Sequence, residues 1–216
     1  SETDKHMREA SRVSTDVPVS SVSPIQETAT GAEHPQDAPL SIHDMTVAYH
    51  RKPVLWDVDL DVPKGQLVGI IGPNGAGKSL FLRLCHGLIK PSAGDVIWHG
   101  AGKCEPAHYQ TMVLQRPVLL RRTVAANVDY ALSVKGVPRR QRGAIVAEVL
   151  AGTGLSRLTL QQARRLSAGE QQKLALARAW AIKPQVLFLD EPTASLDPAA
   201  THAVEKIIDQ IHTAGT

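Results

Sequence analysis

Residues 72–79, which read Gly-Pro-Asn-Gly-Ala-Gly-Lys-Ser, decide the fold of this chain. They fit the pattern G-x-x-x-x-G-K-[ST], whose glycines let the backbone turn tightly enough for successive N–H groups to face phosphate oxygens. An apolar run at residues 66–71 precedes the pattern and predicts a fully buried strand, while residues 78–88 predict a helix. A helix N-terminus at this place adds a partial positive charge. The sequence therefore predicts a phosphate-binding loop between a strand and a helix.

The loop supplies the candidate nucleotide ligands. We expect Lys78 to neutralise the β- and γ-phosphates and the Ser79 hydroxyl to ligate Mg²⁺. The other loop residues expected at the nucleotide are Gly72, Asn74, Gly75, Ala76, Gly77 and Leu80. A glycine-rich turn with an incidental lysine is the simpler alternative, and a second motif decides against it.

That second motif is residues 186–191, Val-Leu-Phe-Leu-Asp-Glu. Its four apolar residues predict a fully buried strand, so that Asp190 and Glu191 emerge at the ligand edge of the sheet. Asp190 suits Mg²⁺ through its water shell, and Glu191 can accept a proton from an attacking water. A solvated strand end would explain one carboxylate. Two carboxylates downstream of a phosphate loop indicate a nucleoside triphosphatase of the P-loop class.

Strand and helix patterns alternate along the rest of the chain. Residues 56–62 alternate between apolar residues, beginning with Trp56, and aspartates, which predicts a half-exposed antiparallel strand. Two short strands are expected at residues 95–98 and 111–115. Helices are expected at residues 123–134 and 167–182 and from Pro198 onward, and a further helix after Pro138 is expected to end at about residue 150. This order implies an α/β fold with a mainly parallel sheet.

Composition bounds the class of protein. The 216 residues suit one domain, and 43% hydrophobic with 21% charged residues is typical of a globular protein. No apolar run approaches the roughly 18 residues of a membrane-spanning helix. The two cysteines, Cys85 and Cys104, exclude a disulfide framework, and the nine histidines show no spacing typical of a zinc site. We expect a soluble intracellular domain.

Charge is distributed unevenly along the chain. Residues 1–39 hold three basic and seven acidic side chains and are rich in Ser, Thr, Pro and Glu, which predicts a flexible tail. Residues 115–165 hold ten basic side chains against only Asp129 and Glu148. Such a surface suits nucleic acid, an anionic membrane face or an acidic protein, but a solvated helical surface explains it more simply. We expect no nucleic-acid partner.

Residues 166–170, Leu-Ser-Ala-Gly-Glu, specify the subclass. Here the chain resembles the ATP-binding subunits of ABC transporters, whose signature is usually written LSGGQ. Ala168 replaces the first glycine of that signature, and Glu170 replaces its glutamine. Further family marks follow in the expected order: Tyr49 as the adenine-stacking aromatic, Gln115 in the Q-loop and residues 195–197 as the D-loop. The resemblance covers residues 40–216.

The resemblance implies a fold and a set of roles. It implies a P-loop core with an N-terminal antiparallel β part and a helical subdomain at about residues 116–165. Two chains would sandwich two ATP molecules, with Ser167 and Gly169 facing the γ-phosphate bound to the other copy. Gln115 would contact Mg²⁺, Glu191 would orient the attacking water, and the remaining nucleotide contacts would come from Tyr49 and Asp197.

Simpler explanations stay open for three of these residues. Tyr49 at a strand end is compatible with ordinary core packing, although stacking on a base could contribute roughly 1–3 kcal/mol. Ser167 is also a good helix N-cap with Glu170 in the first turn. Gln115 fits a solvated strand end.

The chain departs from the family after the last predicted helix. In the family that helix leads to another buried strand and a histidine that contacts the γ-phosphate. Neither His202 nor His212 suits that role. We therefore expect the nucleotide-binding domain to be incomplete at its C-terminus, with a gap in the sheet between the strands of the two phosphate motifs. Lower stability and slower hydrolysis than in a version continued past Thr216 are expected.

The two halves resemble different importers. Residues 49–56 are similar to ATPases of manganese and zinc importers, whereas residues 79–87 and 115–198 are similar to those of tungstate-type oxyanion importers. We weight the second half more, because its helical segment is where family members dock the membrane subunit. The expected partners are an integral membrane permease and a second copy of the ATPase, at the cytoplasmic face of the membrane. The rival interpretations are a soluble ABC ATPase acting on DNA or ribosomes, and a nucleotide-binding module deficient in hydrolysis.

Overall fold

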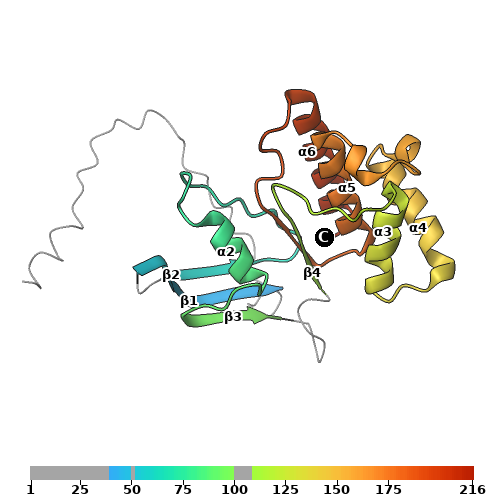
Figure 1. Ribbon diagram of the computed structural model, residues 1–216. Helices are drawn as coiled ribbons and strands as arrows, with labels where there is room; N and C mark the ends of the chain where they lie inside the picture. Colours follow the sequence, from blue (N-terminus) through green and yellow to red (C-terminus); the bar gives the residue numbers. More distant parts are fainter. Residues whose placement is uncertain (1–38, 50–51, 100–108) are drawn as a thin grey trace, which may run out of the picture. The chain divides into compact units, whose positions relative to one another are not determined.

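The computed structural model describes residues 39–49, 52–99 and 109–216, without the side chains of Tyr49, Lys52 and Pro53. Strands and helices alternate along this part of the chain, as predicted (Figure 1). Their order is β1 (Leu40–Tyr49), β2 (Lys52–Val62), α2 (Lys78–Cys85), β3 (Ala93–Trp98), β4 (Gln110–Val113), α3 (Val124–Val134), α4 (Arg139–Gly152), the 3₁₀ turns η3 (Ser156–Leu158) and η4 (Ala163–Arg165), α5 (Ala168–Ala181), β5 (Val186–Leu189) and α6 (Pro198–Thr213). The α/β class is confirmed.

The first three strands form an antiparallel sheet in the order β2-β1-β3, with β1 at its centre. The helix α2 packs on this sheet through Phe81, Leu84 and Cys85, which join Leu40 and Ile42 in one buried cluster. Burial raises the pKa of the Cys85 thiol to about 12, because an apolar environment disfavours the thiolate. This sheet and helix hold the glycine-rich loop that precedes α2.

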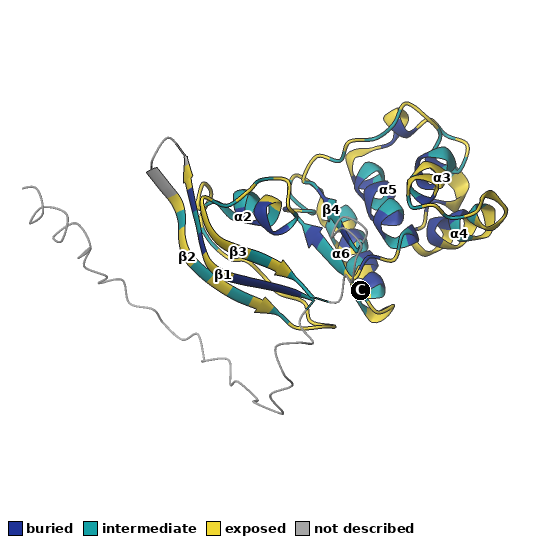
Figure 2. Ribbon diagram, turned by 90° about the horizontal axis from the view of Figure 1, so that it is seen from below, coloured by how far each residue is buried: buried dark blue, intermediate teal, exposed yellow. Residues whose placement is uncertain are grey.

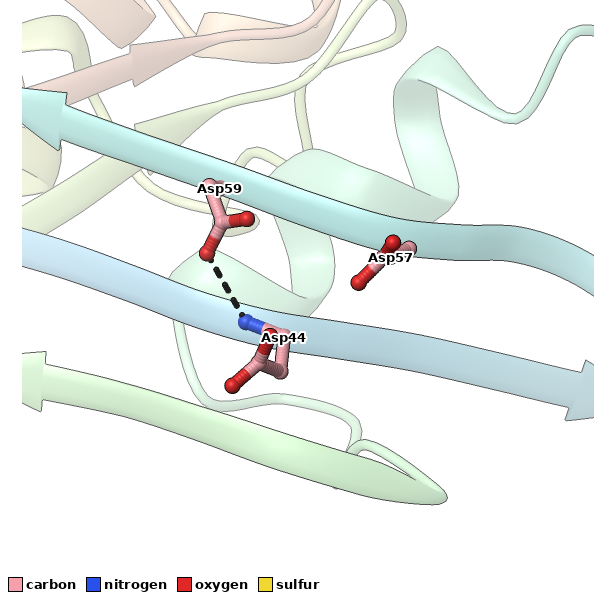
Figure 3. Close-up of side chains that lie close together, drawn as sticks. All are labelled: Asp44, Asp57 and Asp59. Carbon is pink, nitrogen blue, oxygen red and sulfur yellow. Dashed lines mark hydrogen bonds between the residues drawn. The ribbon is translucent and has the colours of Figure 1, made fainter.

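Two irregular residues bend the pairing of β1 with β2. Asp44 and Asp57 adopt left-handed backbone conformations, with φ angles of 50° and 51°, and the register of the two strands shifts around them. Their carboxylates gather with that of Asp59, which accepts a hydrogen bond from the Asp44 N–H at 2.9 Å (Figure 3). Trp56 is consequently 73% exposed, while Leu55 packs in its place against the buried apolar cluster that contains Leu40 and Ile42. The prediction that Trp56 continues the apolar side of this strand is wrong, because a bulge shifts the two-residue period.

A parallel pair, β4 and β5, carries the second motif. Val113 is opposite Leu189, so both strands end at the same edge. Phe188 is buried, with its ring edge-on to Trp98, but the other residues of β5 are only half-buried. The strand is confirmed, but the prediction that it is fully buried is wrong. Within the described residues, only β4 pairs with β5.

Residues 66–71 do not form the predicted buried strand. They have no regular secondary structure and pair with no strand of the described residues, and Ile71 is 99% exposed. A cavity of about 260 Å³ separates this segment from β5, and its apolar walls include Val68, Ile70, Val186 and Ile211. No strand of the described part lies there to satisfy either backbone edge, and an apolar run without a hydrogen-bonding neighbour cannot become a buried strand. Of the two strands expected on either side of a gap, only β5 is present among the described residues, and a cavity lies beside it.

The helices form two further cores. Thr123 caps α3 by accepting a hydrogen bond from the Ala126 N–H, as its sequence position predicted. One core joins α3, α4 and α5, and α6 packs on the opposite side of α5 through Val204, Ile207 and Ile211 (Figures 1 and 2). In the part of the chain that the structure describes, no helix combines the length and the apolar character needed to cross a bilayer.

Candidate functional site

The phosphate loop, residues 72–79, leads directly into α2. Gly75 and Gly77 have φ angles of 84° and 91°, left-handed conformations that favour glycine. Gly77 is the N-cap of α2 and supplies no side-chain cap. Within the described ranges, the N–H groups of Gly77, Lys78 and Ser79 meet no protein acceptor. These amides are available to an anion, as in the first turn of any uncapped helix.

The Lys78 ammonium group lies back over the phosphate loop. Its Nζ donates to the carbonyl oxygens of Gly72 at 2.8 Å and Pro73 at 3.1 Å. The same atom lies 3.8 Å from Glu191 Oε1. An ammonium has three donors and no acceptor, so it can transfer these contacts to phosphate oxygens. The loop and the second motif therefore meet at Lys78.

Ser79 and Asp190 make a second link between the two motifs. The Ser79 hydroxyl donates to Asp190 Oδ1 at 2.7 Å. Asp190 is only 6% exposed, and its backbone N–H donates to the carbonyl of Val113 at 2.9 Å, which holds it at the edge where β4 and β5 end. A hydroxyl beside a buried carboxylate forms the hard oxygen donor set that Mg²⁺ prefers. These residues fit a magnesium ion.

Glu191 follows Asp190 in a left-handed conformation, with a φ of 48°. Its side chain is 43% exposed and has the Lys78 ammonium as its nearest ionic neighbour. A carboxylate that remains open to solvent next to a phosphate loop is positioned to accept a proton from water.

Gln115 lies two residues beyond β4, at the edge where Asp190 emerges from β5. Its side chain is exposed, and no hydrogen bond joins it to Ser79 or Asp190 in the part of the chain described. Two carbonyl oxygens of this segment, those of Leu114 before Gln115 and of Val118 after it, accept hydrogen bonds from side chains of α5. Gln172 Nε2 donates to Leu114 O at 3.4 Å, and Arg178 Nη1 donates to Val118 O at 2.7 Å.

Sequence reasoning missed Gln172 and Arg178. The one available signal was a polar side chain on the apolar side of α5, since Gln172 is 2% exposed. The acceptors lie about sixty positions earlier in the chain, and no local pattern indicates them.

Ser167 is the N-cap of α5 in a complete capping box. Its Oγ accepts from the Glu170 N–H at 3.3 Å and lies 2.9 Å from Glu170 Oε2, to which the hydroxyl donates. The Ser167 N–H also donates to that oxygen, at 2.7 Å. Gly169 is buried against α6, where an added Cβ would lie 2.8 Å from the Ala200 Cβ. The structure thus gives Ser167 and Gly169 structural roles, and no hydrogen bond within the described residues joins them to the phosphate loop.

The remaining predicted contacts lie at several places. Asp197 caps α6 through a hydrogen bond from the Ala200 N–H at 2.9 Å. Leu80 is half-buried in the first turn of α2, and Asn74 is exposed. The Ala76 N–H donates to Pro73 O at 3.2 Å within the loop. The side chain of Tyr49 lies outside the described part.

Comparison with known proteins identifies a family. The family described as "ABC transporter" matches residues 55–194. The chain is 39% identical over 169 residues to the tungstate uptake system ATP-binding protein TupC of Peptoclostridium acidaminophilum. The aligned residues cover 78% of this chain and 79% of TupC. It is 34% identical over 184 residues to the manganese transport system ATP-binding protein MntB of Bacillus subtilis, covering 82% of this chain and 74% of MntB.

A third relative is longer. The methionine import ATP-binding protein MetN of Nocardia farcinica is 40% identical over 169 residues, which span 74% of this chain but only 51% of MetN. Among solved structures, cbiO1 of Clostridium perfringens, part of the ABC transporter complex cbiONQ, superimposes with a TM-score of 0.73 at 25% identity. That match covers 82% of this chain and 75% of cbiO1.

Proposed function

Because this chain belongs to the ABC transporter family, as one of its ATP-binding subunits, we propose that its phosphate loop binds ATP and that Glu191 promotes hydrolysis to drive an importer. The observation that carries the proposal is the pair of links between the two motifs. Ser79 is hydrogen-bonded to Asp190 at 2.7 Å, and Lys78 lies 3.8 Å from Glu191. The hydroxyl and ammonium groups of the phosphate loop thereby lie beside the two carboxylates of the second motif, although the two motifs are more than 100 positions apart in the chain.

Hydrolysis divides the work among these residues. The free amides at the start of α2 and the Lys78 ammonium hold the β- and γ-phosphates of ATP. Glu191 accepts a proton from water as the water oxygen bonds to the γ-phosphorus and the bond to the β-phosphate oxygen breaks, which yields ADP and phosphate. Ser79, Gln115 and Asp190 would hold Mg²⁺, whose charge offsets that of the phosphates. The other contacts proposed at the nucleotide are Tyr49, Gly72, Asn74, Gly75, Ala76, Gly77, Leu80 and Asp197.

The test is Glu191→Gln, which keeps the shape of the side chain and removes the base. ATP binding is expected to stay within about twofold of the parent, while phosphate release falls by about a hundredfold or more. Asp209→Asn, on the exposed face of α6, serves as the matched control. Undiminished phosphate release from the Glu191 variant would remove this residue from the reaction.

We further propose that ATP is closed between two copies of the chain, with Ser167 and Gly169 of one copy facing the γ-phosphate of the other. The start of α5 supports this, because the N–H groups of Ala168 and Gly169 meet no protein acceptor within the described residues, although Glu170 engages Ser167. In the Glu191→Gln variant, ATP is expected to favour a dimer measurable by light scattering. A variant that stays monomeric at saturating ATP would contradict this arrangement.

The proposed permease surface is a groove of about 500 Å³ between β4, α3 and α5. Its rim carries the exposed side chains of Val118, Tyr130 and Val134. It also holds Lys135 and Arg178, and no Asp or Glu lines it. Apolar anchors beside two cations that no carboxylate of the described residues pairs with suit a membrane-protein segment with an acidic side chain, and such a partner would hold the chain at the inner face of the membrane.

For the transported ion we propose a tungstate-type oxyanion, with manganese or zinc as the alternative. TupC supports the first and MntB the second. The two are separated by measuring ATP hydrolysis with a tungstate-type or a manganese-type permease in lipid nanodiscs. Stimulation of several-fold by the tungstate-type permease alone is expected, and stimulation by the manganese-type alone would reverse the assignment.

A second candidate function is nucleotide binding with little hydrolysis. The unpaired and exposed segment at residues 66–71 favours it, because this segment leads directly into the phosphate loop. Binding of MgATP without phosphate release by the parent chain, at concentrations that form the dimer, would select this candidate.

A further inference from the structure

The segment that carries Gln115 is fastened to α5 at both ends. Arg178 Nη1 donates to Val118 O at 2.7 Å, three residues after Gln115. Gln172 Nε2 donates to Leu114 O at 3.4 Å, directly before it. The first distance is that of a strong hydrogen bond and the second that of a weak one. Arg178 is therefore the main attachment and Gln172 the lesser one.

The two donors differ in exposure, because Gln172 is buried whereas Arg178 is half-buried and its hydrogen bond to Val118 O lies at an exposed place. Gln172 is 2% exposed, and the Nε of Arg178 is buried without an acceptor among the described residues. No carboxylate of the described part pairs with Arg178. Burial lowers the pKa of its guanidinium, as expected of a cation without a counter-charge. A half-buried arginine whose one hydrogen-bond acceptor within the described residues is a loop carbonyl can fix the position of that loop.

We propose that Arg178, assisted by Gln172, is a positioning residue that holds residues 114–118 to α5 and so fixes the place of Gln115. The proposal rests on the proposed function only in the role given to Gln115. The α5 helix begins at Ala168, directly after its N-cap Ser167, and carries Arg178 in its last turn. Through these two hydrogen bonds the signature end of α5 and the Gln115 segment act as one body.

The direct test measures the motion of the segment without any nucleotide. In the parent, the ¹⁵N order parameters of Gln115, Arg116 and Val118 should be near the rigid value of about 0.85, and in Arg178→Met they should fall below about 0.6. Arg157→Met is the control, because Arg157 is exposed on η3 and has no described partner; it should leave these values unchanged. Parent-like order in Arg178→Met would overturn the proposal.

A second measurement asks whether the attachment serves Gln115. With a fluorescent ATP analogue, Arg178→Met should bind nucleotide normally in EDTA but need about tenfold more Mg²⁺ for half-maximal tightening, the loss expected for one hydrogen bond. Arg178→Lys should recover part of the loss, because an ammonium can still donate to Val118 O. A purely structural defect would weaken binding with and without Mg²⁺ alike, and that result would reject a positioning role.

A double-mutant cycle completes the test. If Arg178 acts through Gln115, Arg178→Met should add nothing to the Mg²⁺ requirement of Gln115→Ala, and additive effects would contradict it. An unchanged Mg²⁺ requirement in Gln115→Ala alone would instead overturn the role proposed for Gln115, while the order parameters still decide whether Arg178 holds the segment. Should Arg178→Met fail to fold, Gln172→Met and Arg178→Lys take its place, with smaller losses of order at Gln115 expected, and parent-like order in both would reject the proposal.

Discussion

The helices α2 and α5 both begin where a phosphate is expected, but they begin differently. The N-cap of α2 is Gly77, which offers no side chain, and the first amides of α2 meet no protein acceptor within the described residues. The N-cap of α5 is Ser167, whose hydroxyl and backbone N–H are both engaged by the Glu170 carboxylate. One helix start is open and the other is closed by its own side chain.

This difference indicates that the start of α2 serves ATP binding by a single chain, whereas the start of α5 serves the contact between two copies. An open helix start next to a lysine can bind an anion within a single chain. At the closed start, a phosphate must compete with Glu170 for the Ser167 hydroxyl and must approach a carboxylate of like charge. We therefore expect the phosphate loop to supply most of the ATP affinity of a monomer, and the start of α5 to contribute only when two copies meet.

The largest expected effect is that of Lys78→Ala at the open helix start. Loss of a charge-assisted contact to phosphate removes about 1.5–3 kcal/mol, so the dissociation constant for ATP should rise by roughly tenfold to a hundredfold. Isothermal titration calorimetry measures it, with the exposed Lys64 changed to Ala as the control. Equal affinities in the parent and the Lys78 variant would show that the open start of α2 is not the ATP site.

At the closed helix start, Glu170→Gln should strengthen the interaction of α5 with phosphate. The amide keeps an oxygen that can accept from the Ser167 N–H but removes the charge that repels phosphate. The ATP concentration for half-maximal hydrolysis should fall by about threefold to tenfold, a gain of roughly 1 kcal/mol. Glu205→Gln, on the exposed side of α6, controls for net charge. A higher half-saturating concentration would mean that the carboxylate helps the phosphate site.

Gly169→Ala tests whether this glycine serves packing. The added methyl would lie 2.8 Å from the Ala200 Cβ, and such overpacking typically costs about 1–3 kcal/mol. Urea unfolding should show the loss, and Ala200→Gly should restore most of it. Failure of that second change to restore stability would show that the cost arises elsewhere.

The smallest expected effect concerns Cys85 at the other end of α2. Because its pKa is raised to about 12, only about one thiol in ten thousand is ionised at pH 8, so alkylation should be slow. ATP at the start of α2 should slow it further, by suppressing local opening of the helix. Mass spectrometry of the modified peptide measures the rate. An alkylation rate that ATP leaves unchanged would show that ATP does not stabilise α2.

Local signals made part of this structure predictable. Thr123, Ser167 and Asp197 each begin a helix through a side-chain cap, so the sequence around them is sufficient to place α3, α5 and α6. The phosphate loop and the 186–191 motif are similarly local, and Ser79 and Lys78 join the two in the structure.

Features that depend on distant partners were not predictable. Residues 66–71 carry the composition of a strand, but a strand also needs a neighbouring edge, and none is present among the described residues. Trp56 leaves the apolar side because Asp44 and Asp57 bend the pairing of two strands. Gln172 and Arg178 find their acceptors in a loop remote in sequence.

Binding of ATP at the open start of α2 can be followed by the chemical shifts of the backbone amides during a titration of the monomeric chain with MgATP. We expect the largest changes at Gly75, Gly77, Lys78 and Ser79, and none beyond the noise at Ala168 and Gly169. Changes centred on the start of α5, or an undisturbed phosphate loop at saturating ATP, would contradict this expectation.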